Sequence, residues 1–407
     1  MPEAVVVAAA RSPIARAYKG SMTGLRPDDL ALQIFTAVLG QVPQLDPAAI
    51  DDILLGCAAP GGEQGFNLAR VLAVLAGLDG VPGTTMTRYC ASSLQTTRAA
   101  FHAIRAGEGD VFASVGVETV SRYVKGNSDR LPDTKNPRFD TAQQVSAARS
   151  AEAEPEPWVS GRGVGRLPDA YIAMGQTAEN VAQAQKVTRE EQDAFAALSQ
   201  RRYADALAVG FWADEITPVT LPDGDILDHD ECPRPGTTEA GLAGLGPVFR
   251  PRGTVTAGNS CPLNDGAAAL IIMSDVRARE LGVRPLGRII ATGVSALDPE
   301  IMGLGPVEAT RQALRRAGMT IGDIDLTEMN EAFAAQVVPS YRRLGIDIDR
   351  LNVHGGAIAL GHPFGMTGAR MTGTLLHGLA ARDATIGLET MCVAGGQGMA
   401  IIVERLS

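Results

Sequence analysis

The chain alternates short apolar segments with amphipathic ones, and this alternation limits the possible folds more than any other feature. Strand-length apolar runs occupy residues 5–9, 53–57 and 111–117, and residues 27–38 repeat apolar side chains at helical spacing. The same rhythm returns from residue 267 to the end of the chain. Strands that alternate with helices build layered α/β structures, so we expect an α/β protein.

A polar stretch interrupts this rhythm between about residue 121 and residue 170, where Pro, Gly, Asp and Arg are frequent. Long excursions inside α/β chains are usually lids or functional insertions. Helical patterns resume after it, and Thr188 with Glu191 matches a capping box. We therefore predict two similar α/β halves, residues 1–118 plus 251–284 and residues 285–407, around an inserted domain of residues 119–250.

Two distant stretches contain the ingredients of a cysteine nucleophile and its base. Cys90 opens a predicted helix, where the positive end of the helix dipole favours a thiolate. His362 lies between a glycine and a proline, and Cys392 begins a glycine-rich segment that we expect to form a tight turn. Most cysteines are buried and unreactive, so a cysteine alone does not indicate a catalytic nucleophile.

Composition excludes several classes of protein. The net charge of −10 argues against nucleic-acid binding through general electrostatics. The five cysteines show no paired spacing, which fits neither a disulfide framework nor a zinc site and indicates a reducing compartment. The N-terminus lacks signal-peptide features, and no apolar run approaches the roughly 18 residues of a membrane span. We expect a cytoplasmic protein without a membrane segment.

Seven segments, in order along the chain, resemble signatures of the thiolase family, the 3-ketoacyl-CoA and acetyl-CoA acyltransferases. They are YCASSLQT at 89–96, MGQTAEN at 174–180, GTVTAGNSCPLNDGAAA at 253–269, MGLGP at 302–306, NEAFAAQ at 330–336, NVHGGAIALGHPFG at 352–365 and CVAGGQG at 392–398. The resemblance implies a thiolase fold, in which the two halves stack as α-β-α-β-α layers and the insertion forms a CoA-binding lid.

The resemblance also implies catalytic roles. Cys90 would attack the keto carbon of a 3-ketoacyl-CoA and carry the acyl group, while His362 takes its proton and later helps to hold a thioester oxygen. Cys392 would act as acid and base at the α-carbon of the substrate. One oxyanion hole would use His362 with a water positioned by Asn330, and the other the backbone N–H groups of Cys90 and Ala394.

Substrate contacts are implied by the resemblance as well. Arg234 would contact the nucleotide end of CoA, although a solvated surface arginine is an equally good interpretation. Cys261 would lie near the pantetheine arm. Met174, Met302 and Phe333 would line the substrate site, while methionine more often fills a core. The implied reaction needs no metal or redox cofactor, because CoA is a substrate, and relatives form homodimers or homotetramers.

Some positions depart from the commonest family pattern, namely Thr87, Ser93, His354 and Ala394. Ala394 keeps its N–H, so the oxyanion hole survives unless the backbone there needs a positive φ. Ala173 stands where short-chain enzymes often have a histidine, which mildly favours a different acyl pocket. Glu331 could merely begin a helix, and we expect structural or exposed roles for the remaining histidines, His102, His229 and His377.

Three other functions remain open from the residues. A related enzyme would condense two acetyl-CoA molecules to acetoacetyl-CoA, because an enzyme accelerates both directions. A decarboxylating ketoacyl synthase has a similar nucleophile segment but lacks a second thiol like that of Cys392. A non-catalytic homologue would bind CoA and leave Cys90 unacylated. The acyl-transfer interpretation requires that Cys90, His362 and Cys392 converge in space.

Overall fold

The computed structural model describes residues 1–125 and 134–407, so residues 126–133 of the predicted insertion lie outside the described residues. The first half contributes β1 (Ala4–Arg11), β2 (Ala15–Arg16), β3 (Asp52–Gly56), β4 (Gly83–Met86), β5 (Val111–Thr119) and β8 (Asn264–Ser274). The second half contributes β9 (Gly287–Ala296), β10 (Leu326–Met329), β11 (Ile386–Val393) and β12 (Gln397–Arg405). The strand order is β10-β11-β12-β9-β1-β8-β5-β3-β4, with β2 paired to β8.

The two halves repeat one pairing pattern. In the first half β1 and β8 are antiparallel, β8 and β5 are antiparallel, and β5 and β3 are parallel. In the second half β9 and β12, β12 and β11, and β11 and β10 follow the same sequence of orientations. The half-sheets join where Val5 and Val6 of β1 pair with Arg288 and Gly287 of β9. The predicted similarity of the halves is therefore visible in their topology.

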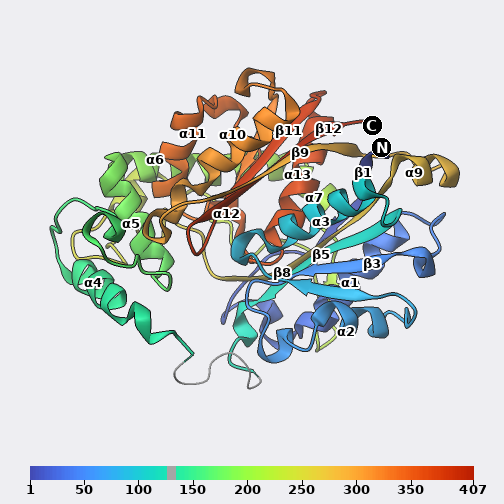
Figure 1. Cartoon of the computed structure of the whole chain (residues 1–407), viewed down its shortest axis with the longest axis horizontal. Helices are drawn as coiled ribbons and strands as arrows, with labels where there is room; N and C mark the ends of the chain where they lie inside the picture. The colour runs from blue at the N-terminus through green and yellow to red at the C-terminus, as the bar shows by residue number, and fades with distance from the viewer. Residues whose placement is uncertain (126–133) are drawn as a thin grey trace.

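Helices form three layers around the two half-sheets, as the family resemblance implies. The central layer is α3 (Ser92–Ala106) with α13 (Thr367–Ala381), which contact each other and strands of both half-sheets. Helices α1 (Pro27–Gly40) and α2 (Leu68–Leu75) cover the outer face of the first half-sheet. Helices α10 (Gly305–Ala317) and α11 (Ala334–Leu344) lie outside the second (Figure 1). The remaining short helix of the first half is α9 (Asp275–Leu281).

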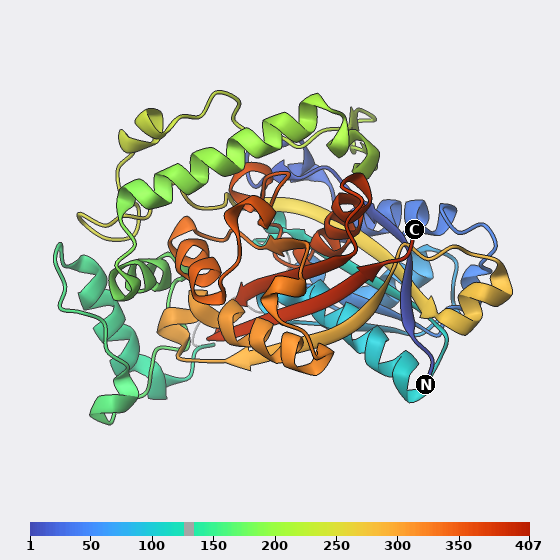
Figure 2. The same cartoon turned by 90° about the horizontal axis from the view of Figure 1, so that it is seen from above.

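The described part of the insertion is mostly helical and lies along one side of the layers (Figure 2). Its elements are α4 (Asp140–Ala151), α5 (Met174–Gln185), α6 (Arg189–Ala208), α7 (Phe211–Glu215), β6 (Val219–Thr220), β7 (Ile226–Leu227) and α8 (Glu239–Ala243). Thr188 and Glu191 form the predicted capping box of α6. Helix α6 packs against α12 (Ala357–Leu360), in the segment that precedes His362. The predicted domain boundaries stay a prediction.

Two strands differ from the sequence interpretation. The residues of β4 include two threonines and no run of large apolar side chains, so they give no strand signal. Cys392 is in β11, paired with Gly398 of β12, rather than in a turn. The expected turn at Cys392 is wrong because Glu389 and Thr390 interrupt the apolar pattern of this strand, and because the glycines that follow suggest a turn. Among the described residues, no helix combines the length and low charge that crossing a membrane requires.

The central helices approach each other closely at Gly368. A Cβ atom on Gly368 would lie 2.2 Å from the backbone nitrogen of Leu94, and neither backbone can move without disturbing its helix. A hydrogen bond from the Ala369 amide to Ser93 Oγ, 2.9 Å long, reinforces the contact. The absence of a side chain at Gly368 therefore permits the close spacing of the two helices that follow Cys90 and His362.

We predict that Gly368→Ala lowers the free energy of unfolding by about 2 kcal/mol or more, because the new methyl group overpacks this contact. Gly40→Ala is the matched control, since a Cβ at Gly40 of α1 meets nothing within 4 Å. Urea denaturation of both variants measures the difference. Equal stability of the two variants would contradict the prediction.

Candidate active site

Cys90 lies in a short 3-10 turn (Tyr89–Ala91) directly before α3. Tyr89 has a φ of 44°, so the chain turns sharply at the residue before the thiol. Ser92 fixes this turn, because its hydroxyl donates to the Tyr89 carbonyl at 2.6 Å and accepts from the Arg88 amide at 2.9 Å. The turn packs against β11 and α13, which brings Cys90 to the strand of Cys392.

The Cys90 sulfur is almost fully enclosed, with 7% of the residue exposed. Burial raises the pKa of the Cys90 thiol to about 12, and hydrogen bonds from the backbone N–H groups of Ala394 and Cys90 oppose the rise. The helix dipole therefore does not lower the pKa of the Cys90 thiol overall, because desolvation outweighs the groups that favour a thiolate. These two N–H groups are the pair that the sequence assigned to an oxyanion hole.

Cys392 is fully buried near the end of β11. Burial raises the pKa of its thiol well above the ordinary value, and the neighbouring Cys90 and Cys261 sulfurs raise it further. The three sulfurs are thus close enough to interact electrostatically. Ala394 lies in the following turn without a positive φ, which is confined to Gly395 and Gly396 there, so alanine is tolerated and its N–H stays available.

His362 is buried and held at both ends of its ring and by its backbone. The backbone turns at Gly361, whose φ is 113°, and the His362 amide donates to Asn264 Oδ1 at 2.8 Å. Its Nδ1 lies 2.6 Å from Thr367 Oγ1, which already donates its only proton to the Pro363 carbonyl at 2.7 Å. His362 Nδ1 must therefore carry the ring proton, which leaves a lone pair on Nε2.

Asn330 lies next to Nε2 of the His362 ring, on the side opposite Thr367. Its Nδ2 is 3.2 Å from His362 Nε2, as expected for a donor facing a lone pair. Asn330 Oδ1 is buried and has no hydrogen-bond partner among the described residues, so it can accept a hydrogen bond from a bound molecule. Burial, followed by the charge of Arg370, lowers the pKa of His362 to about 3, so the ring is neutral around pH 7.

Hydrogen bonds connect the three stretches. The bond between Ala369 and Ser93 links the start of α13, after His362, to the start of α3, after Cys90. The backbone N–H of Asn330 donates to the Thr390 carbonyl of β11 at 3.0 Å, two residues before Cys392. The stretches that carry the candidate catalytic residues are thus assembled at one place between the half-sheets.

Apolar side chains surround Cys392 on the side of the insertion. The cluster contains the predicted substrate residues Met302 and Phe333, and Met174 and Cys261 pack against it. Met302 comes from a 3-10 segment after β9, Phe333 precedes α11 and Met174 opens α5, so three separate elements meet here. We call this group the Cys392 cluster.

Two predicted residues are placed elsewhere. The exposed Arg234 lines a cleft with Cys232 and Ser260, outside the Cys392 cluster. Glu331 is buried and accepts hydrogen bonds from Ser199, from Asn352 and from the backbone of the segment before His362, so its role is structural. His102 and His229 are exposed, and the rings of His354 and His377 each stack on the ring of Phe211.

Sequence reasoning missed three residues of this site. Thr367 sets the His362 tautomer, Asn264 holds the His362 backbone, and Phe249 packs against the Cys392 cluster. Asn264 lies inside the quoted 253–269 segment, but an asparagine there gives no sign of its partner 98 residues away. Thr367 follows His362 by five residues, a spacing that only the observed backbone makes meaningful.

We predict that Thr367→Val weakens the preference for the Nδ1–H tautomer of His362, because valine cannot accept a hydrogen bond from Nδ1 and only Asn330 then favours that tautomer. Thr367→Ser is the matched control, since serine keeps the hydroxyl. Nitrogen-15 NMR of protein labelled in its five histidines reports the two ring nitrogens separately. An unchanged His362 spectrum in the valine variant would contradict the assignment.

Comparison with known proteins agrees with this arrangement. Residues 4–276 match the family model for the thiolase N-terminal domain, and residues 283–405 match the thiolase C-terminal domain. The chain is 43% identical over 418 residues to a β-ketoadipyl-CoA thiolase of Escherichia coli, covering 100% of both proteins. It is 41% identical to a 3-ketoacyl-CoA thiolase of Bacillus subtilis, covering 99% of this chain and 100% of the relative.

Solved structures give the same result for the fold. An acetyl-CoA acetyltransferase of Bacillus anthracis and a human mitochondrial 3-ketoacyl-CoA thiolase each superpose with a TM-score of 0.85 at 34% identity. Each alignment covers 100% of this chain and 99% of the other. With two family models spanning nearly all of its length, the chain belongs to the thiolase family.

Proposed function

We propose that this protein is a 3-ketoacyl-CoA thiolase, which cleaves a 3-ketoacyl-CoA with CoA to give acetyl-CoA and a shortened acyl-CoA. One observation carries the proposal: the backbone N–H groups of Ala394 and Cys90 oppose the rise that burial causes in the pKa of the Cys90 thiol, and Cys90 and Cys392 are near enough to raise the pKa of the Cys392 thiol. Preorganised donors next to a nucleophile stabilise the oxyanion that forms when it attacks a carbonyl group. The thiol of Cys392 provides the acid that protonates the α-carbon of the departing acetyl-CoA.

In the first half-reaction the Cys90 sulfur attacks the keto carbon and its proton moves to His362 Nε2. The tetrahedral oxyanion then collapses, the bond between the α-carbon and the keto carbon breaks, and its electron pair passes to the α-carbon as the enolate of acetyl-CoA. Cys392 donates its proton to that carbon. Acetyl-CoA leaves, and the acyl group remains on Cys90 as a thioester.

In the second half-reaction the thiol of CoA attacks the acyl group on Cys90. Cys392, now a thiolate, takes the proton of the incoming thiol, and His362 returns its proton to the Cys90 sulfur as it leaves. All three residues regain their starting protonation. These steps use thiols, an imidazole and backbone groups, so we propose that CoA is a substrate and that no metal or redox cofactor takes part.

The pathway and the compartment are also part of the proposal. An apolar Cys392 cluster suits a hydrocarbon acyl chain, which favours fatty-acid β-oxidation. All five cysteines are free thiols, which fits a reducing compartment such as the cytoplasm. The second candidate is the reverse reaction, formation of acetoacetyl-CoA, because one structural relative is named an acetyl-CoA acetyltransferase.

Mixing the protein with acetoacetyl-CoA in the absence of CoA should leave one acetyl group on Cys90, detected by intact mass and peptide mapping. Cys90→Ala should show no adduct. The acylation rate should stay constant between about pH 6 and about pH 8 and fall only as acid protonates His362, whose pKa is about 3. An unmodified wild-type protein would contradict the mechanism.

The Cys392→Ser variant distinguishes the role of the Cys392 thiol from that of the Cys90 thiol. Acetylation of Cys90 by acetyl-CoA should fall much less in this variant, because the thiolate of CoA can leave without the proton that the enolate carbon requires. Cleavage of acetoacetyl-CoA should fall roughly 100-fold or more, since a hydroxyl is a poor acid for the enolate carbon. Equal loss of both reactions would mean that Cys392 serves only to pack the site.

Kinetics with 3-ketoacyl-CoA substrates of increasing chain length separate the candidate substrates. The proposed β-oxidation role predicts a higher kcat/KM for medium and long chains than for acetoacetyl-CoA. 3-Oxoadipyl-CoA belongs in the series because an Escherichia coli relative carries that name. A marked preference for acetoacetyl-CoA would favour the second candidate.

We further propose that the protein is a homo-oligomer that pairs through the edge next to β4. Strand β4 is at the end of the sheet, and Phe66 close to it is 94% exposed, which is unusual for a large apolar side chain. Phe66→Asp should weaken association at least tenfold, as measured by light scattering over a dilution series. A monomeric wild-type protein would refute the proposal.

A further inference from the structure

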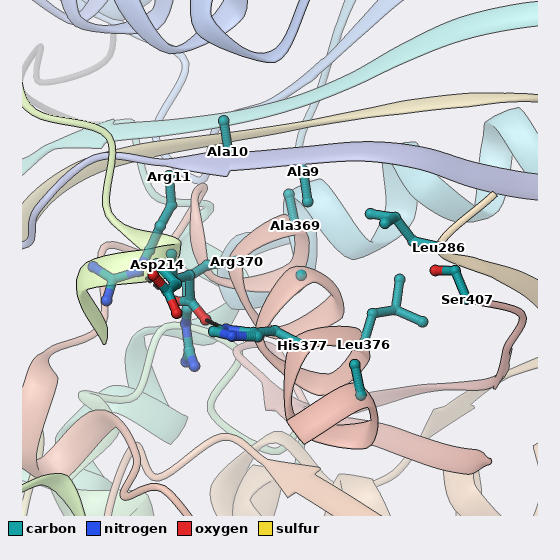
Figure 3. Close-up of a pocket in the computed structure, with 13 residues that line it drawn as sticks. Ala9, Ala10, Arg11, Asp214, Leu286, Ala369, Arg370, Leu376, His377 and Ser407 are labelled. Atoms are coloured by element: carbon teal, nitrogen blue, oxygen red, sulfur yellow. Dashed lines mark hydrogen bonds and ion pairs between the residues drawn. The ribbon is translucent and has the colours of Figure 1, made fainter. Parts of the chain in front are cut away.

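Glu118, the next-to-last residue of β5, is fully buried and takes no part in the proposed reaction. Its two oxygens accept hydrogen bonds only from uncharged donors among the described residues. These donors belong to Cys57, Ala58, Ala59, Gln64, Tyr123 and Gly365. The largely buried Glu215 instead pairs with Arg11 and lies near His377, and Figure 3 shows both basic residues at one end of the cavity between β1 and α13. Glu118 therefore connects neutral segments of the chain and does not compensate a positive charge.

The alternation of side chains along β5 directs Glu118 toward the central helix layer. Ser114 and Gly116 share its face of the strand, and Ser114 Oγ lies 2.9 Å from Thr97 Oγ1 of α3. A Cβ on Gly116 would lie 2.3 Å from the Gly365 carbonyl oxygen, and a Cβ on Gly365 would lie 2.3 Å from a backbone oxygen of β5. The chain at Gly365 therefore lies directly against β5, next to Glu118.

Glu118 Oε2 holds the loop that carries His362. It accepts a hydrogen bond from the Gly365 amide at 2.8 Å. Gly365 lies between His362 and Thr367, whose hydroxyl accepts a hydrogen bond from the imidazole. The contact with Glu118 is thus within the short segment that fixes both the position and the tautomer of the ring.

The same oxygen also holds the segment that leads to Cys90. It accepts a hydrogen bond from the Ala58 amide at 2.8 Å, in the loop after β3. The Ala58 carbonyl oxygen accepts in turn from Thr87 Oγ1 at 3.1 Å, and Thr87 lies shortly before Cys90 in the chain. One carboxylate oxygen therefore connects the Cys90 and His362 segments.

We propose that Glu118 is a positioning residue, whose Oε2 fixes the distance between the Cys90 and His362 segments. This inference rests on the proposed function, in which the thiol proton of Cys90 passes to His362 Nε2. Proton transfer requires the two side chains within hydrogen-bond reach, so a small displacement of either segment slows acylation. Because Glu118 acts through the backbone of Ala58 and Gly365, its loss should affect the rate much more than substrate binding.

Two substitutions of Glu118 separate its acceptor oxygen from its bulk. Glu118→Gln retains one oxygen that can accept from Ala58 and Gly365, whereas Glu118→Met has a similar length and no strong acceptor. In rapid-quench single turnovers with acetoacetyl-CoA, Glu118→Met should acylate Cys90 about tenfold more slowly or worse, with a half-saturating concentration within about threefold of wild type. Glu118→Gln should restore the rate to within about threefold. A wild-type rate in Glu118→Met, or an equal loss in both variants, would overturn the proposal.

Two other positions control this test. Tyr123→Phe removes a donor from Oε1 and leaves both hydrogen bonds to Oε2, so the acylation rate should stay within about threefold of wild type. Thr87 is exposed, and Thr87→Val breaks the hydrogen bond to Ala58 even if Glu118→Met does not fold. Thr87→Val should slow acylation about threefold or more, and Thr87→Ser should not. Slow acylation in Tyr123→Phe, or an unchanged rate in Thr87→Val, would contradict the assignment.

Nitrogen-15 NMR of His362 tests the positioning without the reaction. Glu118→Met should weaken the preference for the Nδ1–H tautomer, because Gly365 no longer anchors the loop that holds Thr367 beside the ring. Glu118→Gln should keep the wild-type signals. If the wild type is not acylated, the proposed function fails, whereas changed His362 signals in Glu118→Met still support positioning by Glu118. Unchanged signals in a folded Glu118→Met variant would refute it.

Discussion

The contact between α3 and α13 is the constraint on which the active site depends. Each helix follows one of the candidate catalytic residues, so the distance between the helices fixes the distance between the Cys90 and His362 stretches. Gly368 permits this distance, because any side chain there would strike the backbone of Leu94. The half-sheets enclose the two helices from both sides. The central layer is therefore buried and holds the Cys90 and His362 stretches in place.

That enclosure also determines protonation. A buried thiol keeps its proton and a buried imidazole stays neutral, so Cys90 and His362 rest as an uncharged pair instead of a thiolate and an imidazolium. Thr367 then selects the tautomer that can receive a proton at Nε2. In the proposed mechanism, charge appears only when a carbonyl group is attacked, next to the N–H groups of Cys90 and Ala394 that can stabilise it.

The buried polar groups of the protein fall into two kinds. Glu331 has every expected partner and holds the segment before His362 in place. Asn330 at the candidate active site instead leaves Oδ1 without a hydrogen-bond partner among the described residues. Glu331 therefore fixes the structure, whereas the free oxygen of Asn330 can accept a hydrogen bond from a bound molecule.

The sequence by itself determined the α/β class and the family, because strand and helix periodicity are local and the family segments occur in order. It also predicted which residues form the active site. It also indicated Met174, Met302 and Phe333, which lie in or against one apolar cluster. Only the tertiary structure placed Cys392 on a strand, separated Arg234 from the Cys392 cluster and paired His362 with Thr367. It also showed that burial raises the pKa of the Cys90 thiol. Those features depend on burial and on contacts between distant segments, and no local pattern in the chain encodes either.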